Sequence, residues 1–119
     1  MTASQANTRR FYIRVQHQDP ILVQPIGGAS ANRFFYMLAE DLSEGGVKLL
    51  SPELMAVDTR LLLDISMPSP PAIHIVGRVA WVRQDGANAH WDLGVSFVEL
   101  DHESRARLKT LVAARRNTE

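Results

Sequence analysis

The segment RRFYIR, residues 9–14, carries side chains that can bind both a phosphate and a nucleobase. Arg9, Arg10 and Arg14 lie where a short polar N-terminus gives way to an alternating, strand-like pattern. A guanidinium binds phosphate, or the O6/N7 edge of guanine, through two parallel hydrogen bonds, and it also stacks on bases. Arginine supplies 11 of the 13 basic residues. A GC-rich genome also explains that excess, so these arginines are a weak signal by themselves.

A second polar cluster lies in AEDLSEGGVKLL, residues 39–50, where Asp41, Ser43, Gly45 and Gly46 interrupt an apolar stretch. If the segment is a strand, Asp41 and Ser43 point to one face. A carboxylate accepts hydrogen bonds from N1–H and N2–H of guanine, an edge that arginine cannot satisfy. The hydroxyl can donate to a phosphate or cap the turn, and glycine permits conformations or close approaches that a Cβ prevents. The alternative is that Asp41 and Ser43 only brace the turn through local hydrogen bonds.

The remaining polar residues give little support for catalysis or metal binding. The four histidines are scattered, without the short spacings typical of metal ligands, and there is no cysteine to supply a thiolate. We find no nucleophile with a base, no paired acid and base, and no glycine-rich phosphate loop before a helix. We therefore predict no catalytic residue, no metal site and no cofactor.

Size and charge also limit the class of protein. A chain of 119 residues that is 45% apolar suffices for one domain with one core. With 13 basic and 13 acidic residues, the net charge does not favour a nucleic acid polymer as partner. The N-terminus lacks the apolar segment of a signal peptide, and no apolar run approaches the roughly 20 residues that span a bilayer. We expect a cytoplasmic protein without a membrane span, either a monomer or a weak dimer.

Hydrophobic periodicity predicts strands along most of the chain. Residues 60–67, 73–83 and 91–100 alternate cleanly. Residues 32–43 are apolar on both faces, which predicts a strand packed on one side and covered on the other. The prolines within residues 19–28 confine that strand to an edge or a bend.

The period becomes helical only after Leu100, where Asp101 is a plausible N-cap and apolar residues recur at helical spacing. Six or seven short strands followed by one helix predict an all-β fold with one C-terminal α-helix, a closed antiparallel barrel. We expect residues 1–8 to be a disordered tail, residues 9–116 a single domain and residues 117–119 a short tail.

Taken together and in this order, the two polar clusters resemble the signature of the PilZ domain family. That signature is Arg-x-x-x-Arg followed, about 25 to 30 residues later, by Asp/Asn-x-Ser-x-x-Gly. Arg10 and Arg14 match the first element, and Asp41, Ser43 and Gly46 match the second. GRVAWVR and LGVSFVELDHESRARLKTLV also look like the late strands and closing helix of the family, so the similarity covers most of residues 9–113.

The resemblance implies a six-stranded barrel that binds the bacterial second messenger cyclic di-GMP. By the same resemblance, Arg10 and Arg14 would clamp phosphate and guanine, and Asp41 would bond a guanine above a floor shaped by Ser43, Gly45 and Gly46. Arg9 resembles a third arginine found in members that bind a stacked ligand dimer. We expect this arginine arm to be mobile without ligand and to fold over the barrel on binding, which would change the surface offered to a partner protein.

Trp81 admits two interpretations. In the predicted strand 73–83 it shares a face with Val79 and Ile75, which indicates the core. Family members with a similar Ala-Trp strand can place the ring against the ligand, so we include Trp81 among the predicted binding residues. Arg78 and Arg83 are not motif positions and are left out of the predicted site.

Two other functions stay open. One is a PilZ-like adaptor that acts by protein contact without a nucleotide, although such members usually lack the arginine pair or the Asp-x-Ser-x-x-Gly stretch. The other is a small barrel that binds single-stranded nucleic acid through aromatic and arginine side chains. Zero net charge and an aromatic content of only 7% weigh against the second alternative.

Overall fold

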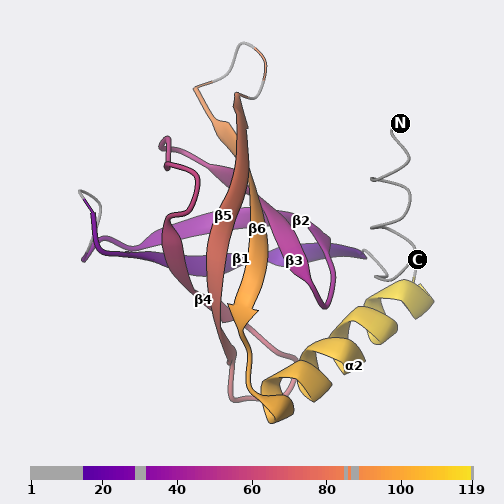
Figure 1. Ribbon diagram of the computed structural model, residues 1–119. Helices are drawn as coiled ribbons and strands as arrows, with labels where there is room; N and C mark the ends of the chain where they lie inside the picture. Colours follow the sequence, from indigo (N-terminus) through magenta and orange to yellow (C-terminus); the bar gives the residue numbers. More distant parts are fainter. Residues whose placement is uncertain (1–14, 29–31, 85, 87–88, 119) are drawn as a thin grey trace, which may run out of the picture.

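The computed structural model describes residues 15–28, 32–84, 86 and 89–118, with side chains described from Pro20 to Arg115 within these ranges. The described chain forms β1 (Val15–Ile26), β2 (Phe35–Leu42), β3 (Gly46–Ser51), β4 (Arg60–Ile65), β5 (Ile73–Gln84), β6 (Trp91–Glu99) and α2 (His102–Thr118). Antiparallel pairing closes the strands into a barrel in the order β1-β2-β3-β6-β5-β4. In Figure 1, α2 lies at the lower end of the barrel and the β5–β6 hairpin projects from the opposite end. The predicted six-stranded antiparallel barrel with a C-terminal helix is confirmed.

Side chains that face inward fill the barrel, as strand alternation predicts. Along β4, Leu61, Leu63 and Ile65 are fully buried, whereas Arg60 and Leu62 are exposed. Because a closed sheet has no free edge, every strand contributes one face to this core. The other core side chains on the strands are Ile21, Val23, Phe35, Met37, Ala39, Leu42, Val47, Leu49, Ile73, Ile75, Val79, Leu93 and Val95.

The prolines of β1 lie where the sheet tolerates them. The pairing of β1 with β2 shifts register between residues 17 and 21, the stretch that contains Pro20. Proline cannot donate to the ladder, so a shift of this kind is the usual accommodation. Pro25 lies beyond the last residue that β1 pairs with β2 and is paired only with Leu61 of β4.

The outer face of β2 differs from the prediction. Phe35 and Met37 point into the core, but Tyr36 and Leu38 are 75% and 54% exposed. The prediction that this strand is covered on both faces is therefore wrong. α2 (His102–Thr118) packs mainly against β1 and β5, so it leaves the outer face of β2 uncovered.

α2 begins at the predicted cap. The carboxylate of Asp101 accepts a hydrogen bond from the backbone N–H of Ser104 at 2.7 Å, which satisfies one of the amides left unpaired in the first helical turn. Leu108, Leu111 and Val112 are buried and complete the core at this end of the barrel.

The helix is also anchored by a polar contact that the sequence did not suggest. Arg107 donates from Nη2 to the carbonyl oxygens of Ser69 and Pro71 at 2.7 and 2.5 Å, which ties α2 to the β4–β5 loop. α2 continues to Thr118, so the domain boundary expected at residue 116 falls inside the helix. None of the described segments forms a helix with the length and apolar character needed to cross a membrane.

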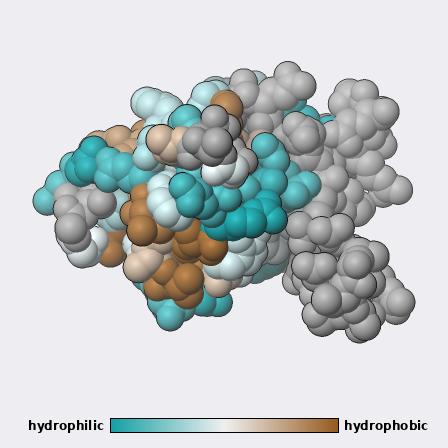
Figure 2. Space-filling model, turned by 90° about the horizontal axis from the view of Figure 1, so that it is seen from above, coloured by the Kyte–Doolittle hydropathy of each residue, from teal (hydrophilic) through white to brown (hydrophobic). Residues whose placement is uncertain are grey.

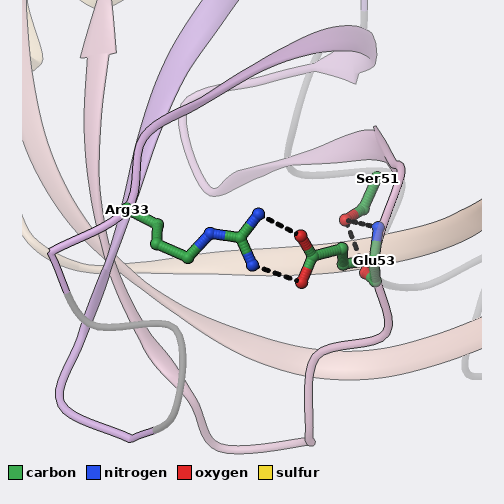
Figure 3. A network of polar contacts seen from close by, with 3 residues as sticks. All are labelled: Arg33, Ser51 and Glu53. Atoms are coloured by element: carbon green, nitrogen blue, oxygen red, sulfur yellow. Dashed lines mark hydrogen bonds and ion pairs between the residues drawn. The ribbon is translucent and has the colours of Figure 1, made fainter.

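A polar network fixes the loop between β3 and β4. The buried hydroxyl of Ser51 donates to the carbonyl oxygen of Glu53 at 2.6 Å and accepts from its N–H at 3.2 Å. Arg33 holds the carboxylate of Glu53 through both terminal nitrogens, at 3.0 and 2.6 Å (Figure 3). The guanidinium of Arg33 also lies 5.0 Å from the centre of the Phe35 ring. This network joins the segment before β2 to the β3–β4 loop, which buries Met55 in the core.

We expect the contribution of the Asp101 cap to depend on pH. The hydrogen bond from the N–H of Ser104 holds the pKa of the Asp101 carboxyl below its ordinary value of 3.8. Its stabilisation is thus present above the pKa of the unfolded chain and is lost as the pH falls through the lower pKa of the folded state. Asp101→Ala should lower the thermal unfolding midpoint at pH 7, and the difference from the wild type should shrink toward pH 2. Thermal unfolding followed by circular dichroism between pH 7 and pH 2 measures this difference in midpoint.

Asp101→Asn is the matched control, because asparagine caps a helix without a titrating charge. Its midpoint relative to Asp101→Ala should change little with pH. A wild-type advantage over Asp101→Ala that stays constant down to pH 2 would contradict the assignment.

Candidate ligand-binding site

Ser43 holds the β2–β3 turn together. Its hydroxyl donates to the carbonyl oxygen of Gly46 at 3.3 Å and accepts from the N–H of Gly45 at 3.2 Å. The backbone N–H of Ser43 donates to the same Gly46 carbonyl at 2.9 Å, and the residue is only 4% exposed. Its hydroxyl is therefore engaged inside the turn, which is the structural role that the sequence left open as an alternative.

Asp41 breaks the strand alternation just before the turn. Its φ of 53° lies in the left-handed region, which aspartate adopts more readily than most residues. The next two residues, Leu42 and Ser43, are both buried. The prediction that Asp41 and Ser43 point to one face of a strand is thus wrong. Asp41 is half-buried, and among the described residues its carboxylate has no hydrogen-bond or ion-pair partner.

Gly46 is required by a close backbone approach. A Cβ at this position would lie 2.2 Å from the carbonyl oxygen of Val95 on β6, far inside van der Waals contact. On the other side of the turn, the N–H of Phe97 donates to the carbonyl of Gly45 at 3.0 Å. The turn is therefore packed directly against β6.

β1 begins beside this turn. Val15 pairs with Leu42, the residue between Asp41 and Ser43 (Figure 1). The chain that precedes Val15 contains the arginines of the predicted arm. Arg9, Arg10 and Arg14 themselves lie outside the described residues, so their predicted role stays a prediction.

Trp81 lies on the outer surface of the barrel and not in the core. Val79 is fully buried, but the pairing of β5 with β6 shifts register between Val79 and Trp81, so that Trp81 is 43% exposed. The simple alternation that placed Trp81 with Val79 fails at this irregularity, because one extra residue moves every later side chain to the opposite face.

The turn and Trp81 are connected across the outer face of four adjacent strands. Glu40 on β2 pairs with Lys48 on β3, Lys48 pairs with Gly94 on β6, and Gly94 pairs with Trp81 on β5. Three strand spacings separate the two ends of this row, roughly 14 Å. The row thus ends at Trp81 on one side and, on the other, at Glu40, the neighbour of Asp41 in the sequence.

Lys48 lies between acidic side chains in this row. Its ammonium is 2.9 Å from a carboxylate oxygen of Glu40. That hydrogen bond raises the pKa of Lys48 above 10.5, burial opposes the rise, and the nearby charges of Glu40, Asp92 and Asp41 add to it. The surface beside the turn is thus rich in carboxylates, and its central cation is already paired.

Four residues that the sequence analysis left out of the site lie on this face: Lys48, Arg83, Asp92 and Gly94. Alternation within residues 91–100 could have placed Asp92 and Gly94 on the outer face. Lys48 lies on the same face of β3, the strand paired with β6. Arg83 was set aside because it matches no motif, although it lies two residues from Trp81.

The end of β1 that lies away from the β2–β3 turn borders a more apolar surface. A hollow of about 510 Å³ lies between the end of β1 and the β3–β4 loop. Ile26, Leu54 and Val57 line it and are strongly exposed. Viewed from above the β5–β6 hairpin, hydrophobic side chains gather next to hydrophilic ones on the molecular surface (Figure 2). Among the described residues, no group of three or more histidine or acidic side chains is placed to hold a metal ion.

The fold is a small, closed β-barrel whose candidate site residues lie at the β2–β3 turn and on the outer face. The family model of the PilZ domain matches residues 8–114. The chain therefore belongs to the PilZ domain family, whose members are binding and regulatory modules and not enzymes.

The fold resembles those of several solved structures, two of which are compared with it below. The first is the Bacillus subtilis inhibitor of motility, MotI/DgrA, with a TM-score of 0.73 and 16% identity over 93% of this chain and 53% of that chain. The second is the PilZ domain of YcgR from Escherichia coli with c-di-GMP, with a TM-score of 0.67 and 18% identity over 92% of this chain and 93% of that chain. This chain thus spans about half of the first protein, and at these identities the likeness shows the fold alone. No curated protein sequence matches it as a relative.

We expect the backbone at Asp41 to decide the stability of its variants. In the left-handed region, alanine costs about 1 kcal/mol more than glycine, because its Cβ approaches the following carbonyl oxygen. Asp41→Ala should therefore be less stable than Asp41→Gly by about that amount in urea unfolding. Equal stability of the two variants would mean that Asp41 is not left-handed in solution.

Gly46→Ala should destabilise the barrel strongly. The added methyl meets a backbone carbonyl of β6, which cannot rotate away, so we expect a loss of about 2–4 kcal/mol in the free energy of unfolding. Glu44→Ala lies in the same turn and only shortens an existing side chain, so this control should change the free energy of unfolding by less than about 0.5 kcal/mol. Similar unfolding curves for the two variants would contradict the close approach.

Proposed function

We propose that this chain is a receptor for cyclic di-GMP. The observation that carries the proposal is the pairing of Val15 with Leu42, because it brings the chain into the barrel next to the Asp-x-Ser-x-x-Gly turn. Membership of the PilZ family and the presence of both signature elements support it. The PilZ domain of YcgR, which shares the fold, was solved with this dinucleotide.

The chemistry of the described surface complements a guanine base. The half-buried carboxylate of Asp41 lacks a described partner, and a carboxylate is the acceptor that N1–H and N2–H of guanine require. In the proposal, Asp41 accepts from one guanine, while Ser43, Gly45 and Gly46 hold the turn that presents it. Trp81 offers an exposed ring on which a base can stack.

The phosphates of the ligand need cations that this surface does not supply. Lys48, Arg78 and Arg83 are already paired with Glu40, Asp58 and Asp92, respectively. Two phosphates brought toward Glu40, Asp41 and Asp92 would be repelled unless other cations accompany them. We assign that role to Arg10 and Arg14, with Arg9 as a third contact if the ligand binds as a stacked dimer.

Binding would then act on a partner through the arginine arm. In the proposal, the arm is mobile without ligand and folds over the outer face of the barrel when the dinucleotide arrives, so the surface offered to a downstream protein changes. The ordering cost lowers the affinity for the ligand. Equal hydrogen-exchange protection of residues 7–14 with and without ligand would remove this step.

Isothermal titration calorimetry with cyclic di-GMP tests the proposal. We expect micromolar binding by the wild type, and the ligand-to-protein ratio decides between a single ligand and a stacked dimer. Asp41→Gly removes the carboxylate but keeps the left-handed backbone, and it should weaken binding about 10- to 100-fold, since a hydrogen bond to a charged group contributes about 1.5–3 kcal/mol. Arg14→Ala should weaken binding by a similar factor.

Two variants control for these changes. Asn32→Gly alters another left-handed residue, which lies at the other end of β2 from Asp41, and Arg105→Ala removes an exposed arginine of α2. Both should bind as the wild type does. The absence of heat with folded wild-type protein would overturn the proposal and favour the adaptor that works by protein contact. Saturable binding of a short oligonucleotide instead would favour the nucleic-acid-binding barrel.

A further inference from the structure

The indole of Trp81 lies directly on the backbone of Gly94. A Cβ built on Gly94 would be 2.0 Å from two indole atoms and 2.6 Å from a third, so the ring occupies the space that any other residue would fill. Gly94 has no positive φ and no turn to form, since it lies in the middle of β6. Close contact with the indole is therefore the reason that this position needs glycine.

A charged pair fixes the ring from the neighbouring positions. The guanidinium of Arg83 lies 5.7 Å from the centre of the Trp81 ring and is bound at 3.0 Å to the carboxylate of Asp92. The side chain of Asp92 is only 10% exposed although it is on the outer side of β6, whereas that of Arg83 is 66% exposed. The buried carboxylate of Asp92 thus holds the guanidinium of Arg83 beside the Trp81 ring.

Trp81 is held in this way, and yet the residue is 43% exposed. The contacts with Gly94 and Arg83 hold the ring without burying it in the core. A fixed, exposed aromatic surface binds a flat partner with less loss of side-chain freedom than a mobile one does.

We propose that Gly94 and the Arg83–Asp92 pair are positioning residues, which hold Trp81 as a stacking surface for a guanine base of the ligand. This inference rests on the proposed function, because it names the residues that prepare that site. Gly94, Arg83 and Asp92 act through the ring and need not touch the ligand.

A double-mutant cycle on Gly94 and Trp81 tests it, with affinity for cyclic di-GMP measured by calorimetry. Gly94→Ala should displace the exposed ring and weaken binding about 10-fold, within the range of base stacking on an aromatic side chain. In a Trp81→Ala background, the same Gly94→Ala change should alter affinity less than about twofold, because its only route of action is gone. Full additivity of the two losses would overturn the inference while leaving the proposed function standing.

The position of the ring is measured without ligand. In a proton–nitrogen NMR spectrum, the indole N–H signal of Trp81, assigned by its absence in Trp81→Phe, should shift in Gly94→Ala while the backbone signals of the barrel persist. An unchanged indole signal in folded Gly94→Ala would overturn the inference whatever the ligand does. No binding by the wild type would overturn the proposed function and this inference together.

The charged pair supplies a second variant should Gly94→Ala fold poorly. Arg83→Gln should move the indole signal and weaken binding about three- to tenfold. Arg33→Gln is the matched control, since Arg33 also joins an ion pair to an aromatic contact but belongs to the network around Glu53. Equal losses of affinity in Arg83→Gln and Arg33→Gln would show a general effect on stability and contradict the positioning role.

Discussion

The approach of β3 to β6 at Gly46 is the contact on which the rest of the site depends. Because Gly46 has no Cβ, the carbonyl of Val95 occupies the space that a side chain would take, and the β2–β3 turn lies against β6. The N–H of Phe97 secures the same turn through the carbonyl of Gly45. Glu40, the residue before Asp41, is thereby held in register with Lys48 and Gly94, and through Gly94 with Trp81.

Sequence periodicity predicts the fold well, because the barrel and its helix follow simple rules. Alternation along residues 60–67 separates Leu61 and Leu63 from Arg60, and the cap at Asp101 marks the start of α2. The outer face of β2 was predicted poorly. Apolar side chains such as Tyr36 and Leu38 look the same in sequence whether they are covered or exposed, and only the packing of α2 against β1 and β5 decides it.

The site was harder to predict than the fold, because its geometry departs from regular structure. The motif spacing found the turn, but not the left-handed backbone of Asp41 or the internal hydrogen bonds of Ser43. Alternation placed Trp81 in the core, and the register shift after Val79 places it outside. The irregularity moves the inward phase of β5 from Val79 to Val82. Because Trp81 is itself hydrophobic, the sequence does not show where this shift occurs, and only coordinates reveal the row that joins Glu40 to Trp81.

The charges along the row from Glu40 to Trp81 also affect which kind of ligand this surface can bind. A protein with no net charge presents Glu40, Asp41 and Asp92 on one face, with Lys48 and Arg83 paired among them. A long polyanion would meet carboxylates at many of its phosphates, with no base edge to compensate each one. A ligand with few phosphates and guanine edges that need acceptors uses the same carboxylates favourably, provided that arginines neutralise its phosphates. The composition of the surface thus supports the proposed guanine dinucleotide over a nucleic acid strand, and under that proposal the arginines before β1 supply the cations that binding needs.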